Sequence, residues 1–371
     1  MQADILLLSS LPTGANVLVR FSDAGNLRVL PARQHPVFLI KKEKNVMKKK
    51  ITALVMAAAM CLSVAACGSS DNGGSGDTAK DTYTVGICQL VQHQALDAAT
   101  QGFKDALKEE LGDKVEFVEQ NAANDIPTCG TICNGFVSDG VDLILANATP
   151  ALQAATAATQ SIPILGTAVT EYGVALDIEN FSGTVGGNVS GTSDLAPLDQ
   201  QAAMFSELLP DAKTVGILYC SAEANSVYQA DVVKAALEDK GITVKIYTFA
   251  DSNDVATVTA TACDECDALY IPTDNTAASC AEAINNVALP KKTPIITGEE
   301  GIAKGCGIAT LSIDYYELGV TTGKMAAKIL TGEGDIATMP IEYYQNPVKK
   351  YNADLCEQLG ITVPSDYTAI G

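Results

Sequence analysis

Hydrophobic and polar positions along this 371-residue chain follow two different periods in turn. Short apolar, β-branched runs at residues 83–88, 115–118, 141–146 and 162–165 have the length and composition of buried strands. They alternate with segments that carry apolar residues at helical spacing, the first of which places Leu96, Ala99, Phe103, Ala106 and Leu107 on one face. Such alternation predicts an α/β fold with a parallel sheet and right-handed crossovers.

A second series of the same elements begins after a glycine-rich break between residues 183 and 191. Its strands are expected at 213–219, 242–247, 268–271, 293–297 and 308–313. We therefore predict two doubly wound parallel-sheet lobes, joined by a three-crossing hinge, with a ligand cleft between them. The N-terminal lobe would comprise residues 82–191 and 314–340, and the C-terminal lobe residues 192–313 and 341–371.

The first 66 residues are interpreted as a leader that does not belong to the folded part. A basic stretch from Met47 precedes the apolar run Ile51–Leu62, which is too short for a membrane span and is followed by small residues and Cys67. This pattern resembles a bacterial lipobox, in which the cysteine is lipidated. Met47 is then the expected start, and residues 1–46 would be either upstream translation or a genuine extension. The alternative to a signal is that the apolar run forms a buried hydrophobic helix. Residues 67–81 are polar and glycine-rich, which predicts a flexible linker.

Charge excludes one class of partner. The formal net charge is −20, and residues 1–66 hold nine Lys and Arg against three Asp and Glu. The remainder therefore carries 15 basic and 41 acidic residues, a net of −26. A surface this acidic repels nucleic acid, so we expect no nucleic-acid partner.

Nine cysteines follow Cys67, an odd number that cannot pair completely within one chain. Two pairs, Cys129 with Cys133 and Cys263 with Cys266, have spacings found in redox or zinc sites, and together they could hold one zinc ion. No histidine lies near either pair in the sequence. We favour the alternative that these cysteines are small buried apolar residues, and we expect neither a metal nor a cofactor.

Seven stretches of the chain resemble, in the same order, the substrate-binding lipoproteins of ABC importers of the tryptophan/tyrosine type, which have the type I periplasmic-binding-protein fold. They include D-L-I-L-A-N-A-T-P-A and A-L-Y-I-P-T-D-N-T, and they lie at residues 86–103, 142–151, 191–194, 216–226, 268–276, 298–304 and 308–319. The resemblance implies an extracytoplasmic, lipid-anchored monomer without enzymatic activity. It would capture an amino acid by hinge closure and deliver it to an ABC permease and its ATPase.

An aromatic ligand (tryptophan, tyrosine or phenylalanine) is what this resemblance favours. A ligand-presenting sensory subunit for a membrane receptor, or a binding protein for another small polar solute, is the alternative. The Glu299–Glu300 pair could in principle serve acid/base chemistry of the glycosidase kind, but no motif brings a complete catalytic set to it. Binding is therefore preferred over catalysis.

The resemblance places the ligand contacts in loops that follow strands and at the hinge. The ammonium group of an amino acid needs a carboxylate partner, for which the candidates are Asp97, Asp274, Glu300 and Asp314; helix capping is the alternative role for two of them, Asp274 and Asp314. The ligand carboxylate needs donors such as helix N-termini and hydroxyl groups. The full set of expected contacts is Gln89, His93, Leu96, Asp97, Thr149, Pro150, Ala151, Ser193, Asp194, Glu223, Asn225, Ser226, Thr273, Asp274, Asn275, Glu300 and Asp314.

An aromatic side chain also needs an apolar slot. The chain has no Trp, so Tyr172, Tyr219, Tyr228 or Tyr315 would have to supply any stacking partner. Packing in the core is the alternative for each of these tyrosines.

Overall fold

The computed structural model describes residues 6–10, 16–20, 28–30 and 82–371, which belong to two units, Met1–Ser75 and Gly76–Gly371. In the first unit, β1 (Leu6–Ser10), β2 (Asn16–Arg20) and β3 (Arg28–Leu30) pair as an antiparallel sheet. The expected start at Met47, the lipidated Cys67 and the linker lie outside the described residues. Among the helices that are described, none has the length and hydropathy of a membrane span.

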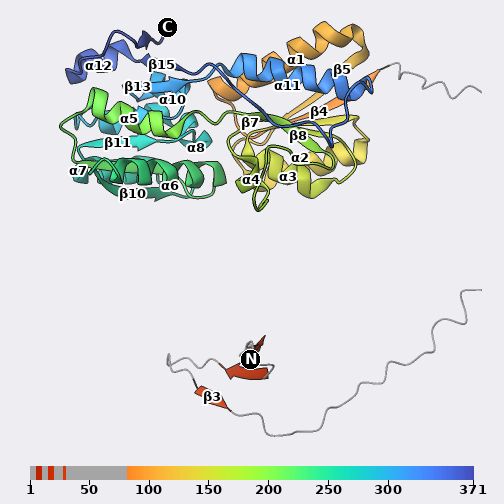
Figure 1. Cartoon of the computed structure of the whole chain (residues 1–371), viewed down its shortest axis with the longest axis horizontal. Helices are drawn as coiled ribbons and strands as arrows, with labels where there is room; N and C mark the ends of the chain where they lie inside the picture. The colour runs from red at the N-terminus through yellow and green to blue at the C-terminus, as the bar shows by residue number, and fades with distance from the viewer. Residues whose placement is uncertain (1–5, 11–15, 21–27, 31–81) are drawn as a thin grey trace, which may run out of the picture. The chain divides into compact units, whose positions relative to one another are not determined.

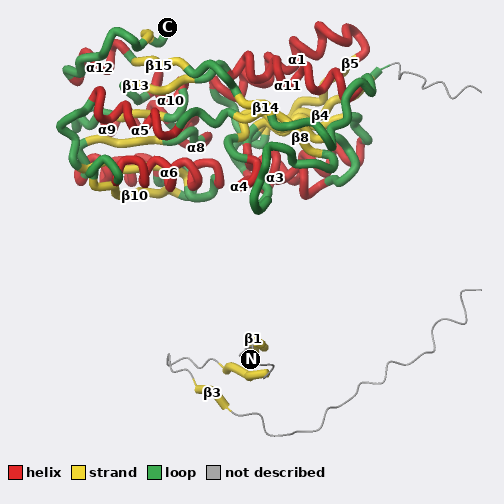
Figure 2. Tube along the Cα trace, in the orientation of Figure 1, coloured by secondary structure: helices red, strands yellow, loops and turns green. Residues whose placement is uncertain are grey.

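The second unit contains two lobes, each built on a sheet between layers of helices (Figures 1 and 2). The N-terminal lobe has the strand order β14-β8-β7-β6-β4-β5 and is parallel throughout. Its strands are β4 (Tyr83–Gln89), β5 (Val115–Asn121), β6 (Leu143–Asn147), β7 (Ile164–Val169), β8 (Val189–Ser193) and β14 (Glu342–Tyr343). Its helices are α1 (Gln94–Leu111), α2 (Ile126–Asp139), α3 (Thr149–Ala158), α4 (Tyr172–Ala175) and α11 (Tyr315–Leu330), with a 3-10 turn at Gly112–Lys114.

The C-terminal lobe has the strand order β10-β9-β11-β12-β13-β15-β16. Only the β13–β15 pair in this sheet is antiparallel. The strands are β9 (Thr214–Cys220), β10 (Thr243–Phe249), β11 (Ala268–Ile271), β12 (Ile295–Thr297), β13 (Ala309–Ser312), β15 (Val348–Tyr351) and β16 (Thr368–Ala369). The helices are α5 (Leu198–Leu208), α6 (Ala224–Glu238), α7 (Val255–Glu265), α8 (Asn275–Ser279), α9 (Ala281–Ala288), α10 (Glu300–Gly305) and α12 (Ala353–Leu359).

The side-chain pattern of the central strands explains the layers. Every residue of β6 and β11 is buried, as expected for parallel strands that are covered on both faces. In β9, Ile217 belongs to the core that includes α5 and α6, whereas Leu218 belongs to the core that includes α7 and α9. Successive residues therefore point to opposite faces, and each face finds its own helices.

The chain passes between the two sheets three times, at residues 194–197, 313–314 and 344–347. β8 continues to Ser193 in the first sheet, and β14 pairs beside it. The first and third passages therefore lie a few residues beyond the sequence-based boundaries at 191/192 and 340/341. The reason is backbone pairing: the two residues of β14 are exposed and carry no hydrophobic pattern that would place them in the N-terminal lobe.

The N-terminal lobe is completed by a helix from the last part of the chain, because α11 lies along α1 (Figure 1). A Cβ atom built on Gly102 would collide with the carbonyl oxygen of Tyr316, and one built on Gly319 with that of Ala99. The two backbones thus approach as closely as only glycine permits. This contact fixes the start of α1, which carries the first cleft loop.

Candidate functional site

The carboxyl ends of strands from both lobes meet around a narrow cavity. It is lined by His93, Leu96, Ala168, Thr170, Asp194, Asn225, Thr273, Asp274, Asn275, Ala278, Glu299 and Tyr315. The volume open to the centre of a water-sized sphere is about 10 Å³, room for about one water molecule. Seven of these residues were predicted ligand contacts, and both lobes and the hinge contribute to the lining.

Asp194 follows β8 directly and has an incompletely satisfied side chain. It is 4% exposed, and its Oδ2 atom accepts a hydrogen bond from the Tyr315 hydroxyl at 2.9 Å. Its Oδ1 atom is buried and has no hydrogen-bond partner. Burial raises the pKa of Asp194 above its usual range, and the neighbouring Thr170 and Tyr315 side chains partly oppose this shift. A cationic N–H donor in the cavity would be stabilised at this oxygen.

Two further buried carboxyl groups face the same cavity. Burial, reinforced by the neighbouring Glu223, raises the pKa of Asp274 to about 8. Burial also raises the pKa of Glu299, while the nearby His93 opposes the change. Three carboxyl groups around one small space favour a positively charged occupant.

The oxygens of Asp274 and Glu299, in contrast to Asp194 Oδ1, have partners within the protein. Asp274 Oδ1 caps α8 by accepting from the Ala277 N–H at 2.7 Å, and its Oδ2 accepts from the Cys220 N–H and the Ser226 hydroxyl, both at 2.7 Å. Glu299 caps α10 through the Gly301 and Ile302 N–H groups. Asp274 therefore caps α8, and its second oxygen holds the Ser226 hydroxyl beside the start of that helix.

The start of α3 carries unsatisfied donors. Ala148, which links β6 to α3, has φ = +94°, and Ala168, near the end of β7, has φ = +51°. Two alanines at adjacent strand ends therefore adopt a positive φ, which is rare for this residue. No side chain caps α3, and the buried Thr149 hydroxyl has no partner. The first turn of α3, which includes the buried Pro150 and Ala151, can therefore receive an anionic group, although none of its residues belongs to the lining of the narrow cavity.

Glu223 organises the opposite lobe. Its buried carboxylate accepts hydrogen bonds from the backbone and side-chain nitrogens of Asn275, at 3.1 and 2.6 Å, and from the backbone N–H and hydroxyl of Thr276, at 2.9 and 2.8 Å. Asn225 Nδ2 makes a longer contact of 3.4 Å with the same group and donates to Thr273 O at 3.0 Å. One carboxylate thus fixes the start of α8.

The residues that Glu223 holds make hydrogen bonds across the cleft. His93 Nε2 lies 3.2 Å from Asn275 Oδ1, and Asn124 Nδ2 donates to Thr276 Oγ1 at 3.1 Å. We call these two contacts the latch. Because each latch bond joins the N-terminal lobe to α8, the latch exists only while the lobes are together.

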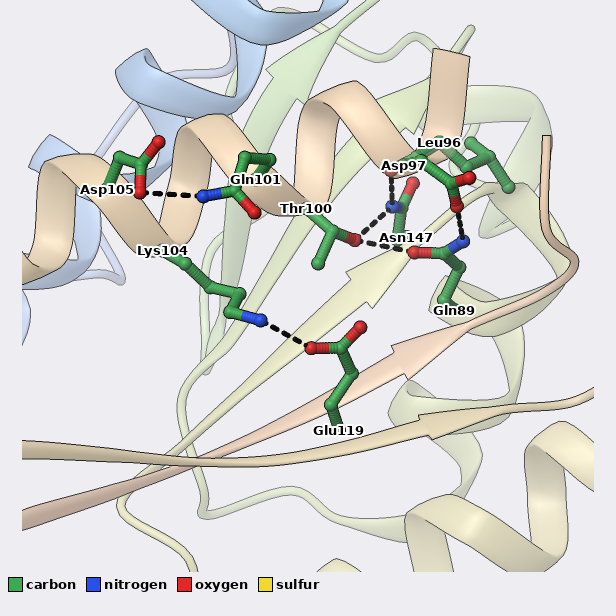
Figure 3. Close-up of polar contacts among 9 residues, drawn as sticks. All are labelled: Gln89, Leu96, Asp97, Thr100, Gln101, Lys104, Asp105, Glu119 and Asn147. Atoms are coloured by element: carbon green, nitrogen blue, oxygen red, sulfur yellow. Dashed lines mark hydrogen bonds and ion pairs between the residues drawn. The ribbon is translucent and has the colours of Figure 1, made fainter. Parts of the chain in front are cut away.

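Gln89 and Asp97 are not among the residues that line the cavity. Their side chains contact each other at the start of α1 (Figure 3). Gln89 Nε2 donates to Asp97 Oδ1 at 2.7 Å, and Gln89 Oε1 accepts from the Thr100 hydroxyl at 2.7 Å. Asn147 Nδ2 donates to Leu96 O and Thr100 Oγ1, both at 2.8 Å. This network ties β4, α1 and β6 together, so it positions the loop that carries His93.

Glu300 and Asp314 line a second, wider space, a groove of about 330 Å³ beside the hinge. Glu300 accepts from the Ser312 hydroxyl at 2.7 Å and pairs with Lys350 at 2.6 Å. Asp314 is exposed and caps α11 through the Glu317 N–H. Both groups are occupied by contacts within the protein, and neither faces the narrow cavity.

The hinge and the tyrosines complete the set of predicted residues. Ser193 donates to Thr170 O at 2.7 Å and accepts from the Leu195 N–H, which shapes the first passage between lobes. Among the four candidate tyrosines, only Tyr315 lines the cavity, and the Tyr172 hydroxyl donates to Thr192 O within the core.

Sequence reasoning missed several residues of this site. Ala168 and Thr170 lie at the end of β7, where the strand-end rule that identified the other loops would also have indicated them. Ala278 is only a small residue inside a short helix, and Asn124 belongs to a loop after an edge strand; neither has a distinctive signal in the sequence. Glu299 enters the sequence interpretation only as a possible catalytic group.

The cysteine pairs show no metal site. Within residues 82–371 no group of three or more His, Cys, Asp or Glu side chains has an arrangement that could hold a metal ion. All nine cysteines of this range are unpaired, and seven of them are buried.

Sequence comparison finds relatives over most of the chain. A family profile described as ABC transporter substrate binding protein matches residues 84–369. The tyrosine-binding protein of Clostridioides difficile (strain R20291) is 36% identical over 308 residues, which are 79% of this chain and 88% of that protein.

Two solved structures extend this picture. The ABC domain in complex with L-Trp from Streptococcus pneumonia is 32% identical, with a TM-score of 0.75, over 78% of this chain and 100% of that one. The ligand-free, open structure of a substrate-binding protein with adhesive properties from Clostridium difficile is 36% identical, with a TM-score of 0.60, over 78% and 99%. The lobe arrangement described above therefore agrees better with the L-Trp complex, although the open protein is more similar in sequence.

Proposed function

The chain belongs to the family of ABC transporter substrate-binding proteins, and on that premise we propose that it captures an aromatic L-amino acid between its lobes. Members of this family bind solutes outside the cytoplasm for an ABC transporter, and the fold is the type I periplasmic-binding-protein fold that the sequence led us to expect. L-Tyrosine and L-tryptophan are the first candidates, because relatives at 36% and 32% identity carry these names in their descriptions.

The observation that carries the proposal is the unpaired Oδ1 atom of Asp194 in an acidic, buried cavity. An α-ammonium group placed there would gain a charge-assisted hydrogen bond to a carboxylate whose other oxygen is already held by Tyr315. The carboxylates of Asp97, Glu300 and Asp314 are less suitable because they lie outside this cavity. Asp274 borders the cavity, but its oxygens already accept three hydrogen bonds.

The ligand carboxylate would lie toward the N-terminal lobe. The Thr149 hydroxyl and the uncapped first turn of α3 supply donors there, and the positive end of the helix dipole favours negative charge. Leu96, Ala168, Ala278 and Tyr315 would then contact the aromatic side chain. The ligand would enter while the lobes are apart. On closure its side chain would extend from the narrow cavity toward the hinge groove, which meets the cavity at Glu299 and Tyr315, residues common to both.

We extend the proposal to the attachment of the protein. The expected lipidated Cys67 and the linker at 67–81 would anchor a monomer beside the membrane, where it passes its ligand to the permease. The protein would catalyse no reaction. Membrane fractionation of a Cys67→Ala variant tests the anchor, because the variant should appear in the soluble fraction with unchanged ligand affinity.

A thermal-shift screen of the L-amino acids tests the ligand class. At a concentration of 100 times Kd, a ligand that binds only the folded state adds about 2.7 kcal/mol, which corresponds to a rise in Tm of roughly 5–10 °C. We expect this rise for tyrosine, tryptophan or phenylalanine, and titration calorimetry with the same amino acids would test it independently. A screen in which only non-aromatic solutes raise Tm would refute the proposed ligand.

A further inference from the structure

The Asp194 carboxyl group is deeply buried but only half satisfied by the protein. It follows β8 on the first passage between the lobes, is 4% exposed, and accepts the Tyr315 hydroxyl at Oδ2 over 2.9 Å. Its Oδ1 atom has no hydrogen-bond partner within the described part of the chain. A buried carboxylate oxygen without a donor is costly, because the charge has lost its hydration and gained no hydrogen bond in exchange. The ligand-free protein therefore favours the neutral carboxyl group.

The groups that face Asp194 from the surrounding elements do not supply a compensating positive charge. Neither Lys nor Arg belongs to the lining of the cavity. The Tyr172 hydroxyl reaches the backbone two residues before Asp194, and His93 Nε2 lies 3.2 Å from Asn275 Oδ1, across the cleft. The titratable groups around Asp194 are two carboxyl groups, two tyrosine hydroxyls and one imidazole: Asp274 before α8, Glu299 before α10, Tyr315 in α11, Tyr172 in α4 and His93 before α1. Only the imidazole among them can become cationic.

Asp274 and Glu299 oppose the ionisation of Asp194, because a negative charge on either of them repels a further one in the same small space. Burial raises the pKa of all three carboxyl groups. Their partners differ, however. Both oxygens of Asp274 accept hydrogen bonds from the protein, and Glu299 caps α10. Asp194 is therefore the member of the three that has an oxygen left for a donor from outside the chain.

We propose that Asp194 exchanges a proton for the ligand ammonium group, so that capture of an amino acid releases up to one proton to the solvent. In the ligand-free protein the proton is bound at Oδ1, the oxygen that Tyr315 does not hold. The ammonium group brings N–H donors to this oxygen and stabilises the carboxylate, so the O–H bond breaks and the proton passes to water or buffer. The proton and the ammonium group thus compete for one atom. This inference rests on the proposed function, since it concerns the same carboxyl group.

Such competition makes the affinity depend on pH. Below the raised pKa of Asp194, each binding event must displace the proton, so Kd should fall as pH rises, by up to tenfold per pH unit. Above that pKa the carboxylate is already ionised, and Kd should become independent of pH. The protein would therefore hold its ligand less tightly in an acidic medium than in a neutral one.

The test is titration calorimetry of the full chain with L-tyrosine and L-tryptophan, at one mildly acidic pH, in buffers that differ in ionisation enthalpy. The dependence of the measured enthalpy on the buffer gives the number of protons released, and we expect a value between zero and one that decreases as pH rises. Indole-3-propionate, which lacks the ammonium group, should release none. The Asp314→Asn control, which changes an exposed carboxylate outside the cavity, should release as many protons as the wild type.

Two results would overturn the inference while leaving the proposed function intact. One is binding of these amino acids with an enthalpy that does not depend on the buffer and a Kd that does not depend on pH. The other is undiminished proton release in Asp194→Asn, which would assign the proton to Asp274 or Glu299. If neither amino acid binds at all, it is the proposed function that fails.

A second measurement serves if Asp194→Asn binds too weakly or does not fold. Infrared difference spectra of the wild-type protein should show the loss of a protonated carboxyl band and the gain of carboxylate bands when ligand is added. Tyr315→Phe removes the donor from Oδ2, so ionised Asp194 is less stabilised and the pH dependence of Kd should move to higher pH. A protonated carboxyl band that ligand leaves unchanged, or an unmoved pH profile in Tyr315→Phe, would refute the exchange at Asp194.

Discussion

Replacement of Asp194 by Asn isolates the charge that we assign to the ligand ammonium group. The substitution keeps the shape of the side chain, and the remaining carbonyl oxygen can still accept the Tyr315 hydroxyl. The negative charge is lost. Truncating one member of a buried charge pair costs about 2–5 kcal/mol, which corresponds to an affinity loss of roughly 30- to 4,000-fold.

Stability should respond differently from affinity. Burial raises the pKa of Asp194, so the ionised group destabilises the ligand-free protein above the pKa of the unfolded chain, and Asn removes this penalty. The new amide N–H, however, is buried beside an unpaired position and costs about 1–3 kcal/mol. The two effects oppose each other, and we expect the Tm of the ligand-free variant to lie within a few degrees of the wild-type value.

Titration calorimetry with L-tyrosine and L-tryptophan measures the effect. Asp314→Asn is the matched control, because Asp314 is exposed, lies outside the cavity, and its capping role is one that Asn also performs. Indole-3-propionate lacks the ammonium group, and its weak binding should be the same in wild type and Asp194→Asn. Wild-type affinity for both amino acids in the Asp194→Asn variant would refute the assignment.

Three further predictions follow from the same geometry. Glu223→Gln leaves fewer acceptors for Asn275 and Thr276, so the latch should loosen. We expect Kd to increase roughly 10- to 100-fold in calorimetry while the circular dichroism spectrum stays unchanged. An unaltered Kd would show that the latch does not contribute to ligand binding. Asp274 has a folded-state pKa of about 8, against 3.8 for the ordinary group. Its contribution to ligand-free stability is therefore complete below pH 3.8 and is lost as pH rises to 8, with a slope of at most about 1.4 kcal/mol per pH unit. Asp274→Asn should reduce the slope of Tm against pH, and an equal slope in wild type and variant would contradict the shift. Solution scattering should show a smaller radius of gyration at saturating ligand, and an unchanged radius would argue against lobe closure.

The fold could be predicted from the sequence because most of its strands are buried on both faces. An apolar run such as β6 or β11 has one plausible fate in an alternating chain, and the order of runs then determines the two sheets. Four strands within residues 82–371 have no counterpart in the sequence prediction. β8 is fully buried but begins inside the glycine-rich break. The other three, β14, β15 and β16, have two to four residues and little or no buried surface. Their positions depend on backbone pairing with strands far away in the sequence, which no local pattern encodes.

The site could be predicted only to the level of loops. The strand-end rule indicated which segments face the cleft, but capping and ligand binding select the same residue types at the same places. Asp274 and Asp314 proved to cap helices, and Glu300 pairs with Lys350, which is distant in sequence. The sequence also does not reveal that one oxygen of Asp194 is unpaired, because this depends on how the carboxylate packs against Tyr315, a residue distant in sequence.

The contact between α1 and α11 determines when this protein can fold. A ribosome makes Gly102 long before Gly319, yet these two glycines belong to one closely packed pair of helices. Until α11 and β14 have been synthesised, the N-terminal lobe lacks a helix of its core and the last strand of its sheet. The C-terminal lobe in turn lacks β15, β16 and α12 until the chain is nearly complete. Neither lobe therefore has all of its native elements until most of the chain has been synthesised, and we expect both lobes to complete their folding late.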